Sequence, residues 1–231
     1  MTKLTVVIPV YNEAGSIGVV LDSWLGVLRS LGVDFKIIAL NDGSKDNSLI
    51  ILRDLASRNR EVEVINKPNS GHGPTILQGY RSAVSEWIFQ VDSDNEMDAS
   101  HFPPLWEKRS NYDLILGRRA DRQSPLVRQA VTAVSRLAVW TFYGLGVMDV
   151  NAPYRLYRTE KFREVFARIP ADTFAPNVVL SGYAAKHRLR ILEIPVPARP
   201  RTTGEVSIKK WKLFRAALKS LLQTVGCSFR I

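Results

Sequence analysis

Two carboxylates one residue apart, Asp92 and Asp94, are the side chains of this 231-residue chain with the clearest chemical use. They directly follow the apolar run Trp87–Val91, which is typical of a buried strand. Alternate residues of a strand point to opposite faces, so both acids can serve one site only if the chain turns near Ser93. Open α/β sheets bind ligands at the carboxyl ends of their strands. Two convergent carboxylates there suit Mg²⁺ or Mn²⁺, since hard cations take oxygen ligands from acids and substrate phosphates.

A further acid, Asp42, follows the apolar run Phe35–Leu40 and strengthens this interpretation. The Asp-x-Asp pattern by itself matches many solvated loops, whereas two acidic strand ends in one sheet indicate a shared site. An Asx-turn or a helix cap is the alternative explanation for Asp42. Two common phosphate-binding devices are excluded, because the sequence has no Gly-Lys dipeptide for a P-loop and no Gly-x-Gly-x-x-Gly after its first strand.

The first hundred residues alternate between strand and helix patterns, which predicts a mostly parallel central sheet with helices on both faces in one α/β domain. The predicted strands are Leu4–Val10, Phe35–Leu40, Val62–Ile65 and Trp87–Val91. The predicted helices follow a cap at Ser16, follow a cap at Asp46 or Asn47, and span Thr75–Ser85.

After Asp94 the pattern is looser. It predicts strands over Leu114–Leu116, Tyr154–Tyr157 and Ile191–Val196, and helices over Pro125–Tyr143, Ala175–Lys186 and Ile208–Gln223. In the last helix, large apolar residues recur three or four apart among lysines, so this helix can either lie in a bilayer interface or pack on the core. The stripe consists of Trp211, Phe214, Leu218, Leu221 and Val225. We therefore predict one domain over residues 1–203 and a basic amphipathic helix and tail over residues 204–231.

The charge is uneven along the chain. Residues 1–100 hold 9 Lys and Arg against 13 Asp and Glu, and the remaining residues hold 23 against 9. This asymmetry indicates an anionic partner for the second half, such as a membrane surface, a phosphate-bearing substrate or nucleic acid, unless it is simply a solvated basic surface. A single cysteine, Cys227, excludes an internal disulfide framework and favours a reducing compartment. We expect a cytoplasmic protein at the cytoplasmic face of the membrane, without a signal peptide or transmembrane helix.

Several motifs together resemble family 2 glycosyltransferases, which have the nucleotide-sugar-binding GT-A fold. The motifs are Val7–Glu13, Asn41–Ser44, Gly71–Gly73 and Asp92–Asp94, in that order. Three later segments resemble the branch that contains dolichyl-phosphate mannose synthase and bacterial polyprenyl-phosphate sugar transferases. These segments are Ile115–Arg119, Tyr154–Arg158 and Leu192–Val196. The resemblance covers roughly residues 3–210 and implies a hexosyltransferase.

The resemblance implies a role for each matching residue. In the nucleotide site, Asp42 would hydrogen-bond the base, Asp92 would contact ribose or metal, and the remaining members would be Pro9, Tyr11, Glu13 and Gly71. Asp94 would coordinate the metal on the diphosphate, and Glu96 is a third metal ligand or a solvated loop acid. His72 is expected to cap or pack within its glycine-rich turn rather than act as a base.

Arginines can support the negative charge that grows on a departing diphosphate. The candidates are Arg118, Arg119, Arg122 and Arg155, with Lys209 and Lys210 further out. The acceptor decides whether a base is needed. A hydroxyl of a glycan or glycolipid would need one, and Asp172 is the only acid near Asn177, which cannot act as a base. A polyprenyl phosphate is already ionised and needs none.

The resemblance implies metal-dependent, inverting transfer from a UDP- or GDP-sugar. The missing acid and the basic half favour polyprenyl phosphate as the acceptor. Transfer to a hydroxyl with Asp172 as base is the alternative within the enzyme class. A nucleic-acid-binding protein is the alternative of another class, but aromatic residues do not interleave with the basic ones in a known module pattern. A catalytically inactive sugar-nucleotide sensor is a third possibility, which the intact Asp92 and Asp94 disfavour.

Overall fold

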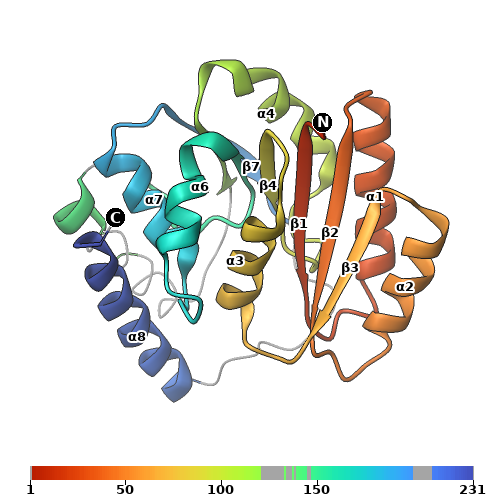
Figure 1. Ribbon diagram of the computed structural model, residues 1–231, viewed down its shortest axis with the longest axis horizontal. Coiled ribbons are helices and arrows are strands. Elements are labelled where there is room, and N and C mark those ends of the chain that lie inside the picture. The colour runs from red at the N-terminus through yellow and green to blue at the C-terminus, as the bar shows by residue number, and fades with distance from the viewer. Residues whose placement is uncertain are drawn as a thin grey trace.

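The computed structural model describes residues 2–120, 133, 137, 139–144, 147–199 and 210–230, and at 120 and 210–217 it describes the backbone alone. Its centre is a seven-stranded sheet in the order β3-β2-β1-β4-β6-β5-β7 (Figure 1). Strand β6 is antiparallel to β4 and β5, and the other neighbouring strands are parallel. The strands are β1 (Leu4–Val10), β2 (Phe35–Asp42), β3 (Val62–Lys67), β4 (Trp87–Gln90), β5 (Leu114–Ala120), β6 (Arg155–Arg158) and β7 (Ile191–Pro197).

Helices cover both faces of the sheet, which confirms the predicted fold class. They are α1 (Ile17–Ser30), α2 (Ser48–Arg58), α3 (His72–Ser82), α4 (Phe102–Lys108), α6 (Thr159–Arg168), α7 (Pro176–Lys186) and α8 (Lys210–Ser228), with 3₁₀ turns η1 (Ala99–His101) and η2 (Arg109–Asn111). The hydrophobic core consists of two clusters, one on each face of the sheet, because successive side chains of β1 point to opposite faces. Val6 and Ile8 pack with α1 and α4, and Val7 packs with α3, α6 and α7. None of the described helices is long and apolar enough to cross a membrane.

The strand order reverses at β1, and a ligand-binding crevice is therefore expected beside this strand. Strand β1 pairs with β2 along one edge and with β4 along the other. In doubly wound sheets, ligands bind outside the carboxyl ends of the two strands at this switch point. The carboxyl ends of β1, β2 and β3 lie at the lower end of the sheet in Figure 1.

Two described helices are missing from the sequence prediction. In α6, Phe162, Val165 and Phe166 have helical spacing, but the charged residues around them weaken the pattern. Helix α4 has two prolines directly after its first residue, and prolines usually indicate a turn but are tolerated in the first turn of a helix. For the same reason α3 begins at His72, ahead of Pro74, three residues before its predicted start.

Some predictions fall partly outside the described residues. Within the predicted helix Pro125–Tyr143, the described residues 133, 137 and 139–143 are helical. The predicted domain boundary at 203/204 lies in the segment 200–209, which is not described. The terminal helix is present as α8 and packs on α7.

Ion pairs around the buried carboxylate of Asp113, just before β5, give a prediction about stability in acid. Asp113 accepts hydrogen bonds from Arg190 Nε at 3.2 Å and Nη2 at 3.0 Å, and Arg158 Nε lies 3.2 Å from Asp113 Oδ1. Desolvation alone would raise the pKa of Asp113, but these two arginines outweigh it and hold the pKa below its ordinary value. The carboxylate therefore stabilises the fold above its unfolded pKa of about 4, and this contribution is lost as the pH falls through the folded pKa.

We expect Asp113→Asn to lower the free energy of unfolding by about 2 kcal/mol at neutral pH, because hydrogen bonds to a charged group are lost. The difference from the unsubstituted protein should shrink below about pH 4. Denaturant unfolding across that pH range measures both effects. The control is Asp54→Asn in the exposed pair with Arg58, which should change stability by less than about 0.5 kcal/mol. A difference for Asp113→Asn that does not vary with pH would contradict this account.

Candidate active site

The acidic turn after β4 is tied to the loop after β1. Asp92 and Asp94 are partly exposed in this turn, and Asp94 Oδ1 accepts a hydrogen bond from Glu96 N at 3.1 Å. Ser16 Oγ lies 2.9 Å from the carbonyl oxygen of Ser93 and 2.9 Å from Glu13 Oε2, and can donate its proton to either. Ser16 occupies the N-cap position of α1, as predicted, but its hydroxyl makes no cap hydrogen bond. It joins the two loops that frame the crevice instead.

His72, the first residue of α3, faces the same turn. Its Nε2 lies 2.9 Å from Asp92 Oδ1. Desolvation lowers the pKa of His72, but the neighbouring carboxylate of Asp92, helped by Asp94 and Asp42, outweighs it and raises the pKa above its ordinary value. The sequence prediction placed His72 within its own turn, whereas the structure pairs it with the acidic turn of β4.

Asp42, at the end of β2, is 3% exposed and organises the glycine-rich turn that precedes α3. Asp42 Oδ1 accepts a hydrogen bond from Ser70 N at 2.8 Å, and Oδ2 accepts one from Gly71 N at 2.9 Å. Lys67 Nζ forms an ion pair with the same carboxylate. The Asx-turn alternative is not what the structure shows, since these partners come from a distant segment rather than from the turn that contains Asp42.

The predicted nucleoside residues of the first loop lie at the same edge of the sheet. Pro9 is within β1, Tyr11 is 39% exposed, and Glu13 is buried, with its backbone N donating to Ser48 Oγ at 2.8 Å. Asn12 has a left-handed φ of 55°, which asparagine tolerates, and its Oδ1 accepts a hydrogen bond from Lys45 N. These contacts hold the β1–α1 and β2–α2 loops together.

Basic side chains reach the acidic turn from β5 and from the segment after β7. Arg119 Nε is buried and donates no hydrogen bond, although it lies 3.4 Å from Glu96 Oε2. Arg118 is exposed. Sequence reasoning missed Arg199, whose Nη2 lies 2.9 Å from Asp98 Oδ2, because no motif marks this residue. Arg122 and Lys209, and the side chain of Lys210, lie outside what the structure describes.

Two other expected site residues lie in very different surroundings. The Arg155 side chain is completely buried and donates to the carbonyl oxygens of Val150, Ala152 and Asn177, so the expectation that it grips a diphosphate does not agree with its position. The Asp172 side chain is 72% exposed, and its Oδ2 lies 3.4 Å from Lys219 Nζ on α8.

The loop 170–175, which carries Asp172, packs against the start of α3. A Cβ atom added to Gly73 would lie within 3.0 Å of the carbonyl oxygens of Thr173 and Phe174. Phe174 N also donates to Gln223 Oε1 of α8 at 2.8 Å. The loop therefore connects α8 to the residue that follows His72.

The acidic turn has the chemistry that a divalent ion requires. Among the described residues, no three His, Cys, Asp or Glu side chains form a metal-binding group, so Asp92, Asp94 and Glu96 are not assembled into a complete ligand set. Mg²⁺ does not need such a set, because it is commonly held by one or two carboxylates together with substrate phosphates. The buried Arg119 Nε, which donates no hydrogen bond, is suited to an anionic group beside these acids. The residues present therefore fit a metal–diphosphate complex.

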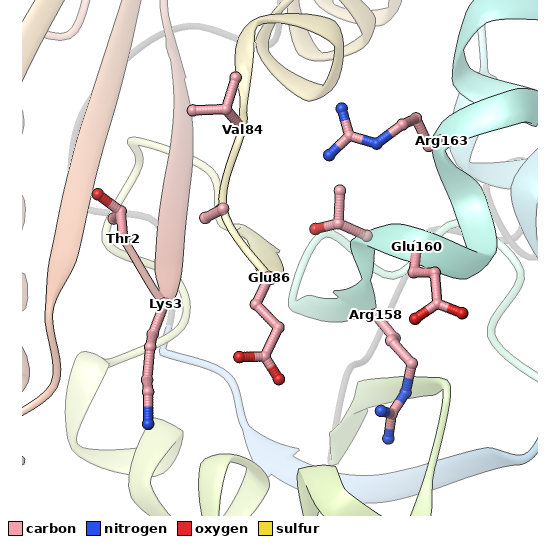
Figure 2. A pocket seen from close by; sticks show the side chains of 9 residues that line it. Thr2, Lys3, Val84, Glu86, Arg158, Glu160 and Arg163 are labelled. Carbon is pink, nitrogen blue, oxygen red and sulfur yellow. The ribbon is translucent and has the colours of Figure 1, made fainter.

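A hollow of about 590 Å³ lies at the opposite end of the sheet and is not part of this site. It is lined by residues at the start of β1, before β4 and at the start of α6. Figure 2 shows Lys3, Glu86, Arg158, Glu160 and Arg163 around it. Lys3 and Glu86 precede β1 and β4, and Arg158 ends the antiparallel β6, whereas Asp92 and Asp94 follow the carboxyl end of β4.

Solved structures show that this is the GT-A fold of glycosyltransferases. Glucosyl-3-phosphoglycerate synthase from Mycobacterium tuberculosis, in complex with Mn²⁺, UDP-glucose and glycerol 3-phosphate, is 18% identical with a TM-score of 0.68, over 97% of this chain and 79% of that one. A mannosyltransferase from Pyrobaculum calidifontis, in complex with GDP-Man and Mn²⁺, is 15% identical with a TM-score of 0.68, over 99% of this chain and 64% of that one.

The model of glycosyl transferase family 2 matches residues 5–166, so the chain belongs to this family. Undecaprenyl-phosphate 4-deoxy-4-formamido-L-arabinose transferase from Edwardsiella ictaluri is 29% identical over 213 residues, which are 91% of this chain and 64% of the relative. The chain spans about three-fifths of the length of the curated relatives it matches. The family and the polyprenyl-phosphate branch inferred from the motifs are thereby confirmed.

Proposed function

We propose that this glycosyltransferase moves a sugar from a UDP- or GDP-sugar to polyprenyl phosphate, in an inverting reaction that depends on Mg²⁺ or Mn²⁺. The observation that carries the proposal is the pair Asp92 and Asp94 at the carboxyl end of β4, beside the switch point at β1. Relatives named as undecaprenyl-phosphate transferases and structural neighbours that hold UDP-glucose or GDP-Man with Mn²⁺ support it. Inversion rests on the family resemblance.

Each group of site residues has a role in this proposal. Asp94, with Asp92, would hold the divalent ion, which acts on the leaving diphosphate as a Lewis acid. Arg119 and Arg118 would donate to the diphosphate oxygens and stabilise the charge that develops there. The nucleoside would bind along the loops that carry Pro9, Tyr11, Glu13, Asp42 and Gly71.

Helix α8 has the polarity of a helix that contacts lipid. Over residues 218–228, whose side chains the structure describes, the buried residues are small, namely Ser220, Thr224, Cys227 and Ser228. In this part of the helix the exposed apolar side chains are Leu218 at 48% and Leu222 at 65%, and Phe229, directly after the helix, is 80% exposed. A helix that packs a hydrophobic stripe on a soluble core would show the reverse arrangement. Its exposed leucines and the adjacent Lys219 suit the interface of an anionic membrane, at the cytoplasmic face.

The same helix connects that membrane face to the site. Gln223 of α8 holds the loop 170–175, and this loop lies against Gly73 at the start of α3. A lipid phosphate arriving along α8 would therefore approach the side of the crevice that contains His72 and Asp92. A phosphate oxygen is already ionised at neutral pH, so this acceptor needs no base, and Asp172 is instead engaged by Lys219 and Gln223.

We expect the double substitution Leu218→Ser and Leu222→Ser to weaken binding to vesicles of anionic phospholipid by tenfold or more. Burying one leucine contributes roughly 1.5–3 kcal/mol, and about 1.4 kcal/mol corresponds to a factor of ten. Cosedimentation measures the binding. The matched control is Val19→Ser with Ile50→Ser, which alters apolar side chains on α1 and α2 that are at least as exposed, and it should leave vesicle binding unchanged. Equal binding by both double variants would remove α8 from the proposed membrane contact.

The decisive experiment is a screen of sugar nucleotides for release of nucleoside diphosphate, with and without undecaprenyl phosphate and with and without Mn²⁺. Release that requires both the lipid phosphate and the metal is the expected result. Robust transfer to free sugars or glycolipid hydroxyls, with none to the lipid phosphate, would instead support the hydroxyl acceptor with Asp172 as base. Release that does not respond to metal would contradict the role of the acidic turn.

A further inference from the structure

A buried chain of hydrogen bonds runs through the protein from Arg155 to Asp92. Arg155 Nη1 donates to Tyr157 Oη at 3.0 Å, and this hydroxyl lies 3.4 Å from Asn177 Oδ1. Asn177 Nδ2 donates to Gln90 Oε1 at 3.0 Å, and Gln90 Nε2 donates to Asp92 Oδ1 at 2.9 Å. Apart from Asp92, every member is at most 2% exposed, so water does not interrupt the chain.

Arg155 and Asp92, at the two ends of this series, fix the direction of every hydrogen bond between them. A guanidinium group can only donate, and an ionised carboxylate can only accept. Gln90 must therefore turn its amide nitrogen to Asp92 and its oxygen to Asn177, and Asn177 must do the same one step further back.

The oxygen of Asn177 is then left for two phenols, those of Tyr157 and of Tyr80 at 2.8 Å. Burial raises the pKa of both tyrosines, so each keeps its proton and can donate. All donors consequently point from the buried cation toward Asp92.

This series of hydrogen bonds explains how the buried Arg155 can act on a site that it does not contact. Among the described residues, Arg155 makes no ion pair, yet its positive charge polarises a series of donors that ends on Asp92. Aligned hydrogen bonds in a low-dielectric interior strengthen one another. Asp92 Oδ1 receives Gln90 Nε2 and also lies 2.9 Å from His72 Nε2, so two partners from different elements hold this carboxylate in one orientation.

We propose that Gln90 and Asn177 are positioning residues, which hold the Asp92 carboxylate in the orientation that binds the metal–nucleotide complex. This inference rests on the proposed function of the acidic turn. Asn177 lies in the first turn of α7, directly after the loop 170–175, while Gln90 ends β4. The pair therefore also links the acceptor side of the crevice to its nucleotide side.

Two substitutions interrupt this series of hydrogen bonds at different positions. Asn177→Asp keeps the size of the side chain but replaces the donor to Gln90 by an oxygen, so the Gln90 amide is drawn away from Asp92. Gln90→Met removes the last donor at nearly equal length. Partners of metal-binding groups typically contribute about 10- to 100-fold to metal affinity or activity. We expect each variant to bind UDP or GDP in the presence of Mn²⁺ about tenfold more weakly in titration calorimetry.

The control is Gln78→Met, the same substitution at a partly exposed position of α3. It should bind the nucleotide like the unsubstituted protein. Circular dichroism establishes that each variant is folded at the temperature of the titration. Should Asn177→Asp fail to fold, the comparison of Gln90→Met with Gln78→Met decides the question.

The double variant distinguishes positioning from a merely structural role. If Asn177 acts through Gln90, then Asn177→Asp in the Gln90→Met background should change the affinity by less than about twofold, because coupled residues are not additive. Fully additive losses, or nucleotide binding by folded Gln90→Met equal to that of Gln78→Met, would overturn the inference while leaving the proposed function intact. Failure of the unsubstituted protein to bind either nucleotide with Mn²⁺ would overturn both.

Discussion

Replacing Asp94 with asparagine will lower the rate of sugar transfer by about a thousandfold while leaving the fold unchanged. Asparagine has the same shape, and its oxygen can still accept the hydrogen bond from Glu96 N that Asp94 Oδ1 accepts at 3.1 Å. What it lacks is the negative charge that holds a divalent ion against the leaving diphosphate. Loss of a single pre-placed electrostatic contact in an enzyme typically lowers the rate about 10²- to 10³-fold, and loss of a metal ligand belongs at the upper end.

The measurement is release of nucleoside diphosphate across a range of Mn²⁺ concentrations, alongside thermal unfolding. Asp22→Asn, at an exposed position of α1, is the control for the same chemical change and should keep full activity. Turnover of Asp94→Asn equal to that of the control would remove the metal role assigned to the acidic turn. A variant that regains its rate only at much higher Mn²⁺ would support that role.

The second large effect is expected from Gly73→Ala, a change of one methyl group. The new Cβ would lie within 3.0 Å of the carbonyl oxygens of Thr173 and Phe174, which belong to the backbone and cannot rotate away. Either α3 or the loop 170–175 must shift, and overpacking of this kind costs about 1–3 kcal/mol or more. Since α3 carries His72, which holds Asp92 of the acidic turn, we expect at least a hundredfold loss of transfer, because even small misplacements of binding groups are costly.

Gly26→Ala supplies the matched control for that substitution. Gly26 lies within α1, and a Cβ added there meets nothing within 4 Å. Alanine should therefore stabilise this helix by about 0.5–1 kcal/mol without affecting transfer. Thermal unfolding and transfer assays on both variants, below the melting temperature of each, test the contrast. Retention of full activity by Gly73→Ala would show that the packing of α3 on the loop is not needed for function.

The parts of the site that sequence could predict are those that depend on neighbours along the chain. Asp42, Asp92 and Asp94 were predictable, because an apolar strand followed by acids in a turn is a local pattern. The roles of Ser16 and Gly73 were not, because each depends on a segment about 80–100 residues away. Such contacts follow from how the loops pack and leave no spacing to read.

Arg155 shows the same limit for a residue that sequence did single out. Its segment resembles a family motif, but the motif does not say which way the guanidinium points. That depends on β6 being antiparallel between β4 and β5, which sets Arg155 opposite Gln90 and encloses its side chain. Strand order is a property of the whole fold, so the burial of this arginine could be known only from the structure.

The reversed direction of β6 also bears on how such enzymes diversify. Strand β5 ends and β6 begins at the same edge as Asp94, so the chain departs from the sheet and returns to it within one neighbourhood. A connection that leaves and returns at one edge does not have to cross either face of the sheet, so its length does not determine which strands pair. Among its described residues, Val150 and Ala152 are constrained, because their carbonyl oxygens accept hydrogen bonds from the buried Arg155. Members of the family can therefore differ in the length of this connection and still keep the same order of strands, provided that the contacts of Arg155 are preserved.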